Sequence, residues 1–283
     1  RELFQIDLLL SRRLVSFQAN KTRAIYRWCK YKEGFSASLV QHFLDRFKIH
    51  TGKLLDPFAG GGTSLFVASS VGIQSEGIEL LPFGQRIIQA RQLVEENISV
   101  EEINRIRGWA TERPWNFSNE SLGLNELRIT RGAYPEDTVR AIGKFMAVPS
   151  KQSDSVRSIL VFALLCILET VSYTRKDGQY LRWDYRSNRR QGKKIFDKGK
   201  IPDFDTAITE KLNEIISDLL SAATPTDLFT VESHHAPITL HGGSCLSILP
   251  ELNPGSFDCI ITSPPYCNRY DYTGLPPVSL TPC

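Results

Sequence analysis

Apolar residues in the N-terminal part of the chain follow helix-like and strand-like spacings in turn. In 35–47, "FSASLVQHFLDRF", they recur every three or four positions, which is typical of an amphipathic helix. Short apolar runs at 52–58 and 73–80 predict buried strands, and helical spacing follows each of them, at 63–72 and 82–97. This order predicts the opening of a doubly wound α/β sheet.

The alternation then stops and returns only near the C-terminal end. Strand-like runs reappear at 237–243 and 257–263. The region between shows helical patterns without further strand–helix alternation, at 100–109, 135–146, 155–172 and 204–223. We therefore expect an α/β domain made of 1–97 and 237–283, with a largely helical insertion at 98–236.

Composition narrows the possible classes of protein. The 283 residues are 41% hydrophobic and 23% charged, which suits a globular core, and the net charge of +3 means that any nucleic-acid surface must be local. Six cysteines lack metal-ligand spacing, so we expect reduced thiols in a cytoplasmic protein and no metal site, the histidines at 234, 235 and 241 included. The most apolar stretch, 158–168, is too short to span a membrane, and no signal peptide is evident.

A glycine-rich turn, "DPFAGGGTS" at 56–64, lies between the first predicted strand and its helix. Three consecutive glycines let backbone amides approach a ligand closely at a helix N-terminus. A phosphate loop would need a lysine where Thr63 stands, and a nicotinamide fold would need a third glycine where Leu65 stands. A turn without a ligand remains an alternative.

This turn resembles the S-adenosylmethionine site of DNA methyltransferases that modify exocyclic amines. The family pattern D-P-F-x-G-x-G-T is met by Asp56, Pro57, Phe58, Gly60, Gly62 and Thr63. The resemblance implies that Asp56 and the backbone of Gly60 and Gly62 hold the methionine end of the cofactor, with Phe58 and Thr63 beside them.

Two further cofactor contacts follow from the same resemblance. Glu79 ends the second predicted strand, where a carboxylate can accept from the ribose hydroxyls; the alternative is a solvated charge at a strand end. Phe35 lies in the segment that these enzymes place over the cofactor, and a plain core position is the alternative. Gly243 stands where the family often has an acid, which leaves Ser244 or Cys245 for the adenine contact.

The stretch "TSPPY" at 262–266 follows the last predicted strand. Neither proline can donate to a sheet ladder, so the turn calls for a functional reason. In the family it resembles, the Ser263 hydroxyl and Pro264 carbonyl accept from the target amine and free its lone pair. Pro265 fixes the direction of that carbonyl, and Tyr266 stacks on the flipped-out base. Serine favours cytosine N4 over adenine N6 as the target.

The insertion contains a strongly basic segment, 173–200, with ten Lys/Arg against three Asp and five interleaved aromatic residues. Basic side chains contact phosphates and aromatic rings stack on bases, so this segment is the candidate surface for double-stranded DNA. A solvated basic loop is the alternative. The candidate DNA contacts are Arg175, Lys176, Arg182, Arg189 and Arg190.

The resemblance implies a seven-stranded sheet, of which the sequence up to residue 272 predicts four strands. We therefore expect a fragment, a changed reading frame, or a second polypeptide that completes the fold, with little activity from this chain alone. The expected function is site-specific DNA methylation in a restriction-modification system. The alternatives are an adenine-N6 enzyme, an RNA or protein methylase, and a DNA-binding remnant without catalysis.

Overall fold

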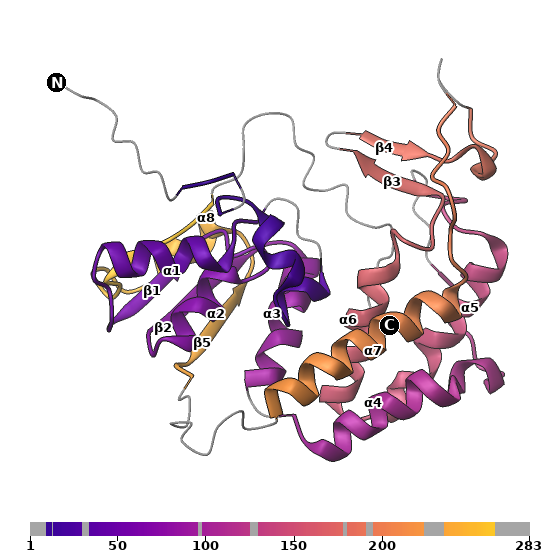
Figure 1. Ribbon diagram of the computed structural model, residues 1–283, viewed down its shortest axis with the longest axis horizontal. Coiled ribbons are helices and arrows are strands. Elements are labelled where there is room, and N and C mark those ends of the chain that lie inside the picture. Colours follow the sequence, from indigo (N-terminus) through magenta and orange to yellow (C-terminus); the bar gives the residue numbers. More distant parts are fainter. Residues whose placement is uncertain are drawn as a thin grey trace. The chain divides into compact units, whose positions relative to one another are not determined.

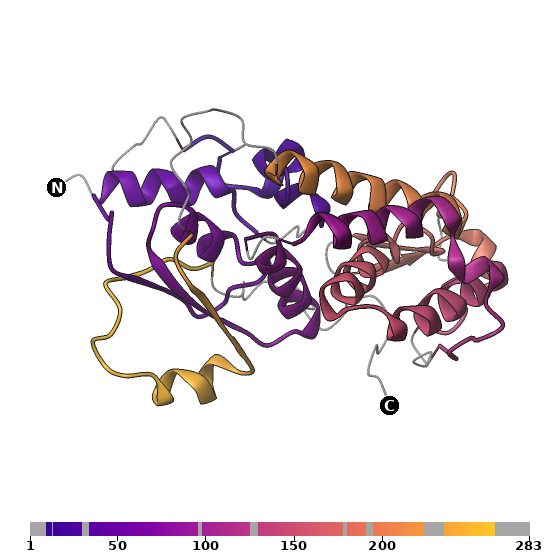
Figure 2. The same cartoon turned by 90° about the horizontal axis from the view of Figure 1, so that it is seen from below.

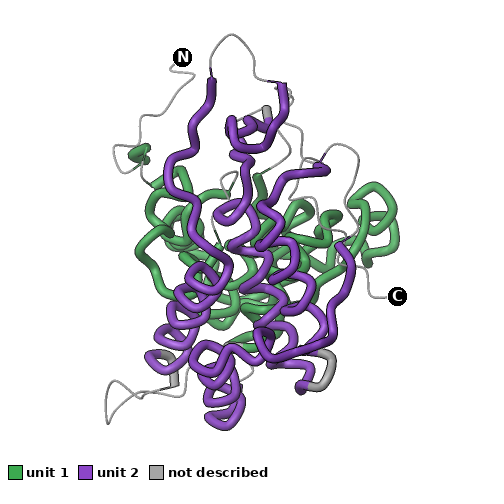
Figure 3. Tube along the Cα trace, turned by 90° about the vertical axis from the view of Figure 1, so that its right-hand side faces the viewer, with its two compact units in different colours: residues 1–97, 222–265 green, residues 98–221, 266–283 purple. Residues whose placement is uncertain are grey.

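The computed structural model shows how these patterns fold. It describes residues 10–12, 14–29, 34–95, 98–124, 130–177, 180–190, 195–223 and 235–263. The chain forms two compact units, here called unit 1, residues 1–97 with 222–265, and unit 2, which includes residues 98–221 (Figure 3).

Unit 1 is built on a parallel sheet of four strands (Figure 1). Its strands, in the order β5-β2-β1-β6, are β5 (Ile238–Gly242), β2 (Gln74–Glu79), β1 (Lys53–Asp56) and β6 (Cys259–Ile260). All four lie where the apolar runs predicted them. The predicted α/β, Rossmann-like fold class is confirmed.

The helices of unit 1 supply the apolar faces that bury this sheet. α1 (Ala37–Arg46) begins at Ser36, whose hydroxyl accepts from the Leu39 amide at 3.1 Å. α2 (Thr63–Ser70) packs against β1, β2 and β5, and α3 (Pro82–Glu95) packs against β2 and β5. The core between them contains fully buried Val40, Leu54 and Leu65.

The central strand β1 pairs on its two sides with strands that come from very different parts of the sequence. β2 follows after a single helix, whereas β6 follows the whole of unit 2. The Asp258 carboxylate reinforces the second pairing, because it accepts from the Lys53 amide at 2.8 Å while the Asp258 amide donates to the Lys53 carbonyl at 2.9 Å. The register of β6 is therefore fixed at the start of β1.

Unit 2 is mainly helical (Figure 2). It contains α4 (Val100–Glu112), a short 3₁₀ turn at Pro114–Phe117, α5 (Glu136–Ala147), α6 (Asp154–Ile167) and α7 (Phe204–Ala223). α4 starts with a capping box between Ser99 and Glu102. Four buried aromatic rings with centroids 5.1–6.2 Å apart join these elements: Trp109, Trp115, Phe145 and Phe204.

Besides its helices, unit 2 contains an antiparallel hairpin that the sequence patterns did not predict. β3 (Thr174–Asp177) pairs with β4 (Tyr180–Trp183) inside the basic segment. These strands are hard to predict because each has four residues and β3 carries three consecutive charged residues. The available signal was the Asp177–Gly178 pair, a common hairpin sequence.

Within the described residues, no helix is both long enough and apolar enough to cross a membrane. The cysteines in the same part of the chain, Cys29, Cys166, Cys245 and Cys259, form no disulfide bonds there.

The aromatic cluster gives a test of unit 2 packing. Trp115 is fully buried, and its indole nitrogen donates to Asp205 at 2.8 Å. Trp115→Ala should lower the free energy of unfolding by about 3–5 kcal/mol, measured by denaturant titration. Phe117 lies in the same turn but is 84% exposed, so Phe117→Ala should change the free energy of unfolding by less than about 0.5 kcal/mol. Equal effects of the two substitutions would contradict this account.

Candidate active site at the glycine loop

Two buried carboxylates lie at the same edge of the sheet in unit 1. Asp56 ends β1 and Glu79 ends β2, and the strands are parallel neighbours. The residues are only 1% and 7% exposed, respectively. Ligands of open α/β sheets bind beyond the carboxyl ends of the strands, so these two acids stand at the expected place for a site.

The groups that bond Asp56 are neutral donors. Its carboxylate accepts from the Ser64 hydroxyl, from the Thr262 hydroxyl at 2.8 Å and from the Phe58 amide at 3.1 Å. Burial raises the pKa of Asp56, although the three hydrogen bonds oppose that shift. A positively charged group would find a desolvated carboxylate here, already held in one orientation.

The Glu79 carboxylate holds the glycine loop from the other side. One oxygen accepts from the Gly60 amide and the other from the Leu81 amide, each at 2.7 Å. Burial raises the pKa of Glu79, and the nearby Asp56 charge raises it further. A carboxylate has about four acceptor positions, so two backbone donors leave capacity for a diol. Gly84 keeps space for this carboxylate, because a Cβ there would lie 2.7 Å from the Glu79 Cγ atom.

The loop itself needs glycine at two positions. Gly60 and Gly62 have φ angles of 55° and 75°, in the left-handed region that other residues rarely adopt. A Cβ on Gly62 would also lie 2.8 Å from the Ile88 side chain. Thr63 begins α2 directly after the loop and is buried, so the helix N-terminus adjoins the two carboxylates.

Sequence reasoning missed Arg91, a buried cation that anchors this loop. Its guanidinium is on α3, donates to the Gly61 carbonyl at 2.5 Å and to the Tyr26 carbonyl at 3.3 Å, and lies over the rings of Tyr26 and Phe66. Arg91 is 2% exposed. Its position on the predicted helix 82–97 was readable, but no local pattern indicated carbonyl partners so far away in sequence.

A second buried polar residue fixes the segment before the glycine loop. The Asn20 side chain donates to the Phe35 carbonyl at 3.2 Å and accepts from the Ala37 amide at 3.0 Å. Phe35 itself is partly buried against the core of unit 1. Its packing agrees with the core alternative, and its contact with a cofactor stays a prediction.

The end of β6 brings the first residues of the TSPPY motif (262–266) to the glycine-rich turn at 56–64. Thr262 bonds Asp56 from 206 positions away in sequence, and Ser263 follows directly in a half-exposed position. The rest of the turn, Pro264, Pro265 and Tyr266, lies outside the described residues. The first residues of "TSPPY" therefore meet the carboxylate of "DPFAGGGT". Near this edge, Ser244 caps the short helix α8 (Cys245–Ile248).

The candidate DNA contacts lie on and beside the hairpin of unit 2. Arg175 and Arg182 occupy opposite positions on β3 and β4, and both are exposed. Lys176 is half-buried and Arg190 is exposed. Arg189 donates to the Arg131 carbonyl at 2.9 Å, and its guanidinium lies 3.7 Å from the ring centroid of Trp183. Arg189 therefore has a structural role in addition to any contact with DNA.

The parallel sheet and the helices that cover it agree with a Rossmann-like methyltransferase fold. The sequence of the chain is similar to those of type II methyltransferases. It is 50% identical over 274 residues to type II methyltransferase M.AvaI of Nostoc sp. and to that of Anabaena variabilis. It is 39% identical over 284 residues to type II methyltransferase M.BsoBI of Geobacillus stearothermophilus.

The coverage of these matches is unequal. They include 96% and 93% of this chain but only 57% and 53% of the M.AvaI and M.BsoBI proteins, so the chain spans somewhat more than half of their length. No family model matches the chain. No solved structure matches it either.

The buried Asp56 carboxylate gives a pH-dependence test. Since its pKa in the folded state is above the ordinary 3.8, its ionisation costs stability as pH rises, and that cost is absent below the unfolded-state pKa. Asp56→Asn removes this ionisation. The unfolding free energy of the variant relative to the parent should therefore increase from about pH 4 to pH 8. A difference that stays constant over this range would refute the assigned shift.

Arg91 gives a second test of the loop. Arg91→Met removes both guanidinium bonds and leaves the buried Gly61 carbonyl without this donor. The unfolding free energy should fall by about 2–3 kcal/mol. Arg86 lies on the same helix but is exposed, so Arg86→Met should cost less than about 0.5 kcal/mol by the same denaturant titration. If both variants are equally stable, Arg91 does not anchor the loop.

Proposed function

We propose that this chain contains the cofactor site and the start of the catalytic turn of a type II DNA methyltransferase. The proposed reaction is transfer of a methyl group from S-adenosylmethionine to the exocyclic amine of a flipped base. The expected target is cytosine N4. The observation that carries the proposal is the convergence on Asp56, where the glycine loop, the end of β2 and the TSPPY strand meet.

The residues at this edge fit the proposed cofactor. S-adenosylmethionine supplies an electrophilic methyl group on a positively charged sulfonium. Asp56 and the backbone of Gly60 and Gly62 would hold its methionine end, next to Phe58 and Thr63. Glu79 would accept from the ribose hydroxyls with the positions that the Gly60 and Leu81 amides leave open. A cationic ligand would also favour the ionised forms of the two carboxylates, whose pKa values burial raises.

The roles proposed for the catalytic turn rest on the family resemblance. The Ser263 hydroxyl and Pro264 carbonyl would accept from the amine hydrogens, so that the nitrogen lone pair is freed from conjugation with the ring. The freed lone pair would then accept the methyl group that S-adenosylmethionine supplies, S-adenosylhomocysteine would be left, and one amine proton would pass to solvent. Pro265 would hold the Pro264 carbonyl in place, and Tyr266 would stack on the flipped base.

Double-stranded DNA is the proposed partner, and the basic segment of unit 2 is the proposed contact surface. Arg175, Lys176, Arg182, Arg189 and Arg190 are the candidates, through phosphates rather than base edges. We place the protein in the cytoplasm as the modification enzyme of a restriction-modification system. Nothing in the structure or in the relatives' names supports a second polypeptide.

Two alternatives differ in measurable products. An adenine-N6 enzyme would place labelled methyl groups in N6-methyladenine, whereas our proposal expects N4-methylcytosine when methylated DNA is digested to nucleosides. A DNA-binding remnant would bind duplex DNA but not S-adenosylmethionine. The serine at 263 supports the cytosine target, because Asp or Asn is commoner in adenine enzymes of the family that the chain resembles.

Calorimetry with S-adenosylmethionine tests the cofactor site. Glu79→Gln should weaken binding by about tenfold or more, because the charge-assisted bonds to the ribose are lost. Glu76→Gln is the matched control: Glu76 lies on the same strand but bonds Lys53 and His241, and its loss should leave the affinity unchanged.

Absence of S-adenosylmethionine binding by the folded parent chain would reject the methyltransferase proposal. Equal weakening by both glutamine variants would reject only the role of Glu79. Circular dichroism spectra of the two variants should match that of the parent.

A further inference from the structure

The basic segment of unit 2 divides its positive charges between two tasks. Arg186 and Lys198 are directed into the fold, whereas Arg175 and Arg182 are exposed on the hairpin. The contacts of Arg186 and Lys198 explain how the hairpin is held in place. The exposed positions of Arg175 and Arg182 need a separate explanation, which rests on the proposed DNA-binding function.

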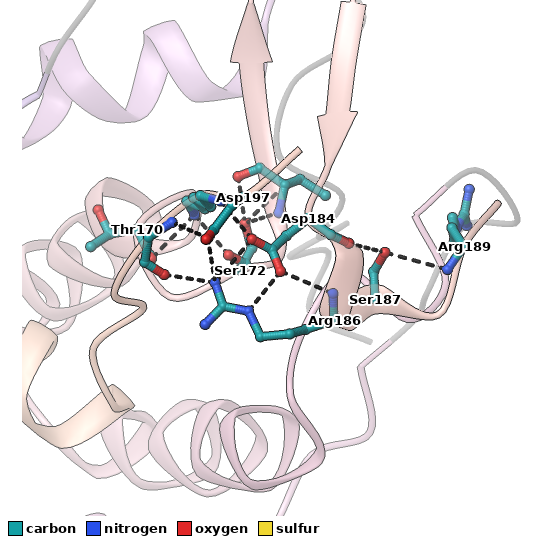
Figure 4. A network of polar contacts seen from close by, with 10 residues as sticks. Thr170, Ser172, Asp184, Arg186, Ser187, Arg189 and Asp197 are labelled. Carbon is teal, nitrogen blue, oxygen red and sulfur yellow. Dashed lines mark hydrogen bonds and ion pairs between the residues drawn. The ribbon is translucent and has the colours of Figure 1, made fainter. Parts of the chain in front are cut away.

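The inward charges surround Asp184, which is completely buried (Figure 4). Its carboxylate accepts from Arg186 Nε at 2.6 Å and Nη2 at 2.9 Å and from the Lys198 amide at 2.6 Å. The Arg186 guanidinium holds the pKa of Asp184 well below its usual range. The Asp184 amide donates to the Tyr173 carbonyl at 2.7 Å, so this network closes the open end of the hairpin.

Lys198 attaches the same network to the residues that follow α6. Its ammonium donates to the carbonyl of Ser172 at 2.7 Å, to that of Thr170 at 3.3 Å and to that of Glu169. Arg186 also donates to the Gly199 carbonyl at 2.6 Å. The open end of the hairpin is thereby fixed to the residues that follow α6. The hairpin is a platform anchored at this end.

On this platform the two faces differ in character. Residues directly opposite in an antiparallel pair share a face, so Thr174 and Trp183 lie on one side and Arg175 and Arg182 on the other. Thr174 is 4% exposed, and Trp183 is half-buried beneath the Arg189 guanidinium. The arginine side is therefore the one that faces solvent.

Two arginines directly opposite each other are an unfavourable choice for a hairpin. Their Cβ atoms are about 5 Å apart, and like charges in such a pair destabilise it. The Arg182 guanidinium also lies 5.7 Å from the Phe196 ring centroid, which restricts its direction. A phosphodiester between the two guanidinium groups would accept paired hydrogen bonds from both.

We propose that Arg175 and Arg182 form a clamp for one phosphate of the DNA backbone, held in position by the Asp184 network. This assignment separates the candidate DNA contacts by task. Arg175 and Arg182 grip the backbone, and Arg189 supports the opposite face by stacking on Trp183. Tyr185, in the turn that follows β4, is 50% exposed.

The test compares duplex binding and thermal stability for Arg175→Gln, Arg182→Gln and the double variant. Fluorescence anisotropy with a labelled mixed-sequence duplex over a salt series gives affinity and salt slope. The double variant should bind about tenfold or more weakly at low salt, with a slope of log K against log salt smaller by about one. Each single variant should keep most of the slope, because the remaining guanidinium still neutralises the phosphate. The double variant should unfold at about the same temperature as the parent, because both side chains are exposed.

Two controls separate charge from structure. Arg105→Gln/Arg107→Gln removes the same net charge from exposed positions of α4, at the other end of unit 2 in Figure 1, and should leave the salt slope unchanged. Arg186→Gln should lower the unfolding temperature, because it leaves the buried Asp184 carboxylate without its guanidinium.

The clamp is overturned if the double variant binds the duplex like the parent, or if it binds weakly only because it unfolds at a lower temperature. A parent that binds inorganic phosphate in calorimetry as tightly as the duplex would overturn the assignment to DNA. Failure of the clamp is distinguishable from failure of the proposed function, because S-adenosylmethionine binding by the parent reports on the latter. That binding should be unchanged in the double variant.

Discussion

The hydrogen bond from the Gly60 amide to the Glu79 carboxylate is the contact on which the candidate site depends. A glycine loop has too little side-chain packing to hold its own shape, so its backbone must be fixed by its surroundings. The Glu79 carboxylate accepts from the Gly60 amide, and the Arg91 guanidinium donates to the neighbouring Gly61 carbonyl. A buried anion and a buried cation thus give one flexible turn a single conformation.

Much of the fold and part of the site could be predicted from sequence because those features are local. β1, α2 and β2 follow from apolar spacing, and Asp56, Gly60 and Gly62 follow from one contiguous motif. Arg91 and Asn20 could not be predicted, because their carbonyl partners are fixed only by the tertiary fold. The hairpin at 174–183 was missed because its strands have four residues each and β3 carries three consecutive charged residues.

Burial and charge are combined differently in the two units. In unit 1 the buried acids Asp56 and Glu79 are held mostly by neutral donors, so their carboxylates remain able to respond to a ligand. In unit 2 the buried Asp184 is fully matched by Arg186, which makes it a structural element rather than a reactive one. The same kind of side chain therefore serves a site in one unit and a scaffold in the other.

The position of β1 between β2 and β6 also has a consequence for synthesis on the ribosome. β1 and β2 emerge early, but the bond between Thr262 and Asp56 joins residues 206 positions apart. At a synthesis rate of about 5–20 residues per second, one edge of β1 stays unpaired for roughly 10–40 s. Such an edge can template pairing with another nascent chain. The order of strands that assembles the site thus makes this chain a candidate for chaperone protection during translation.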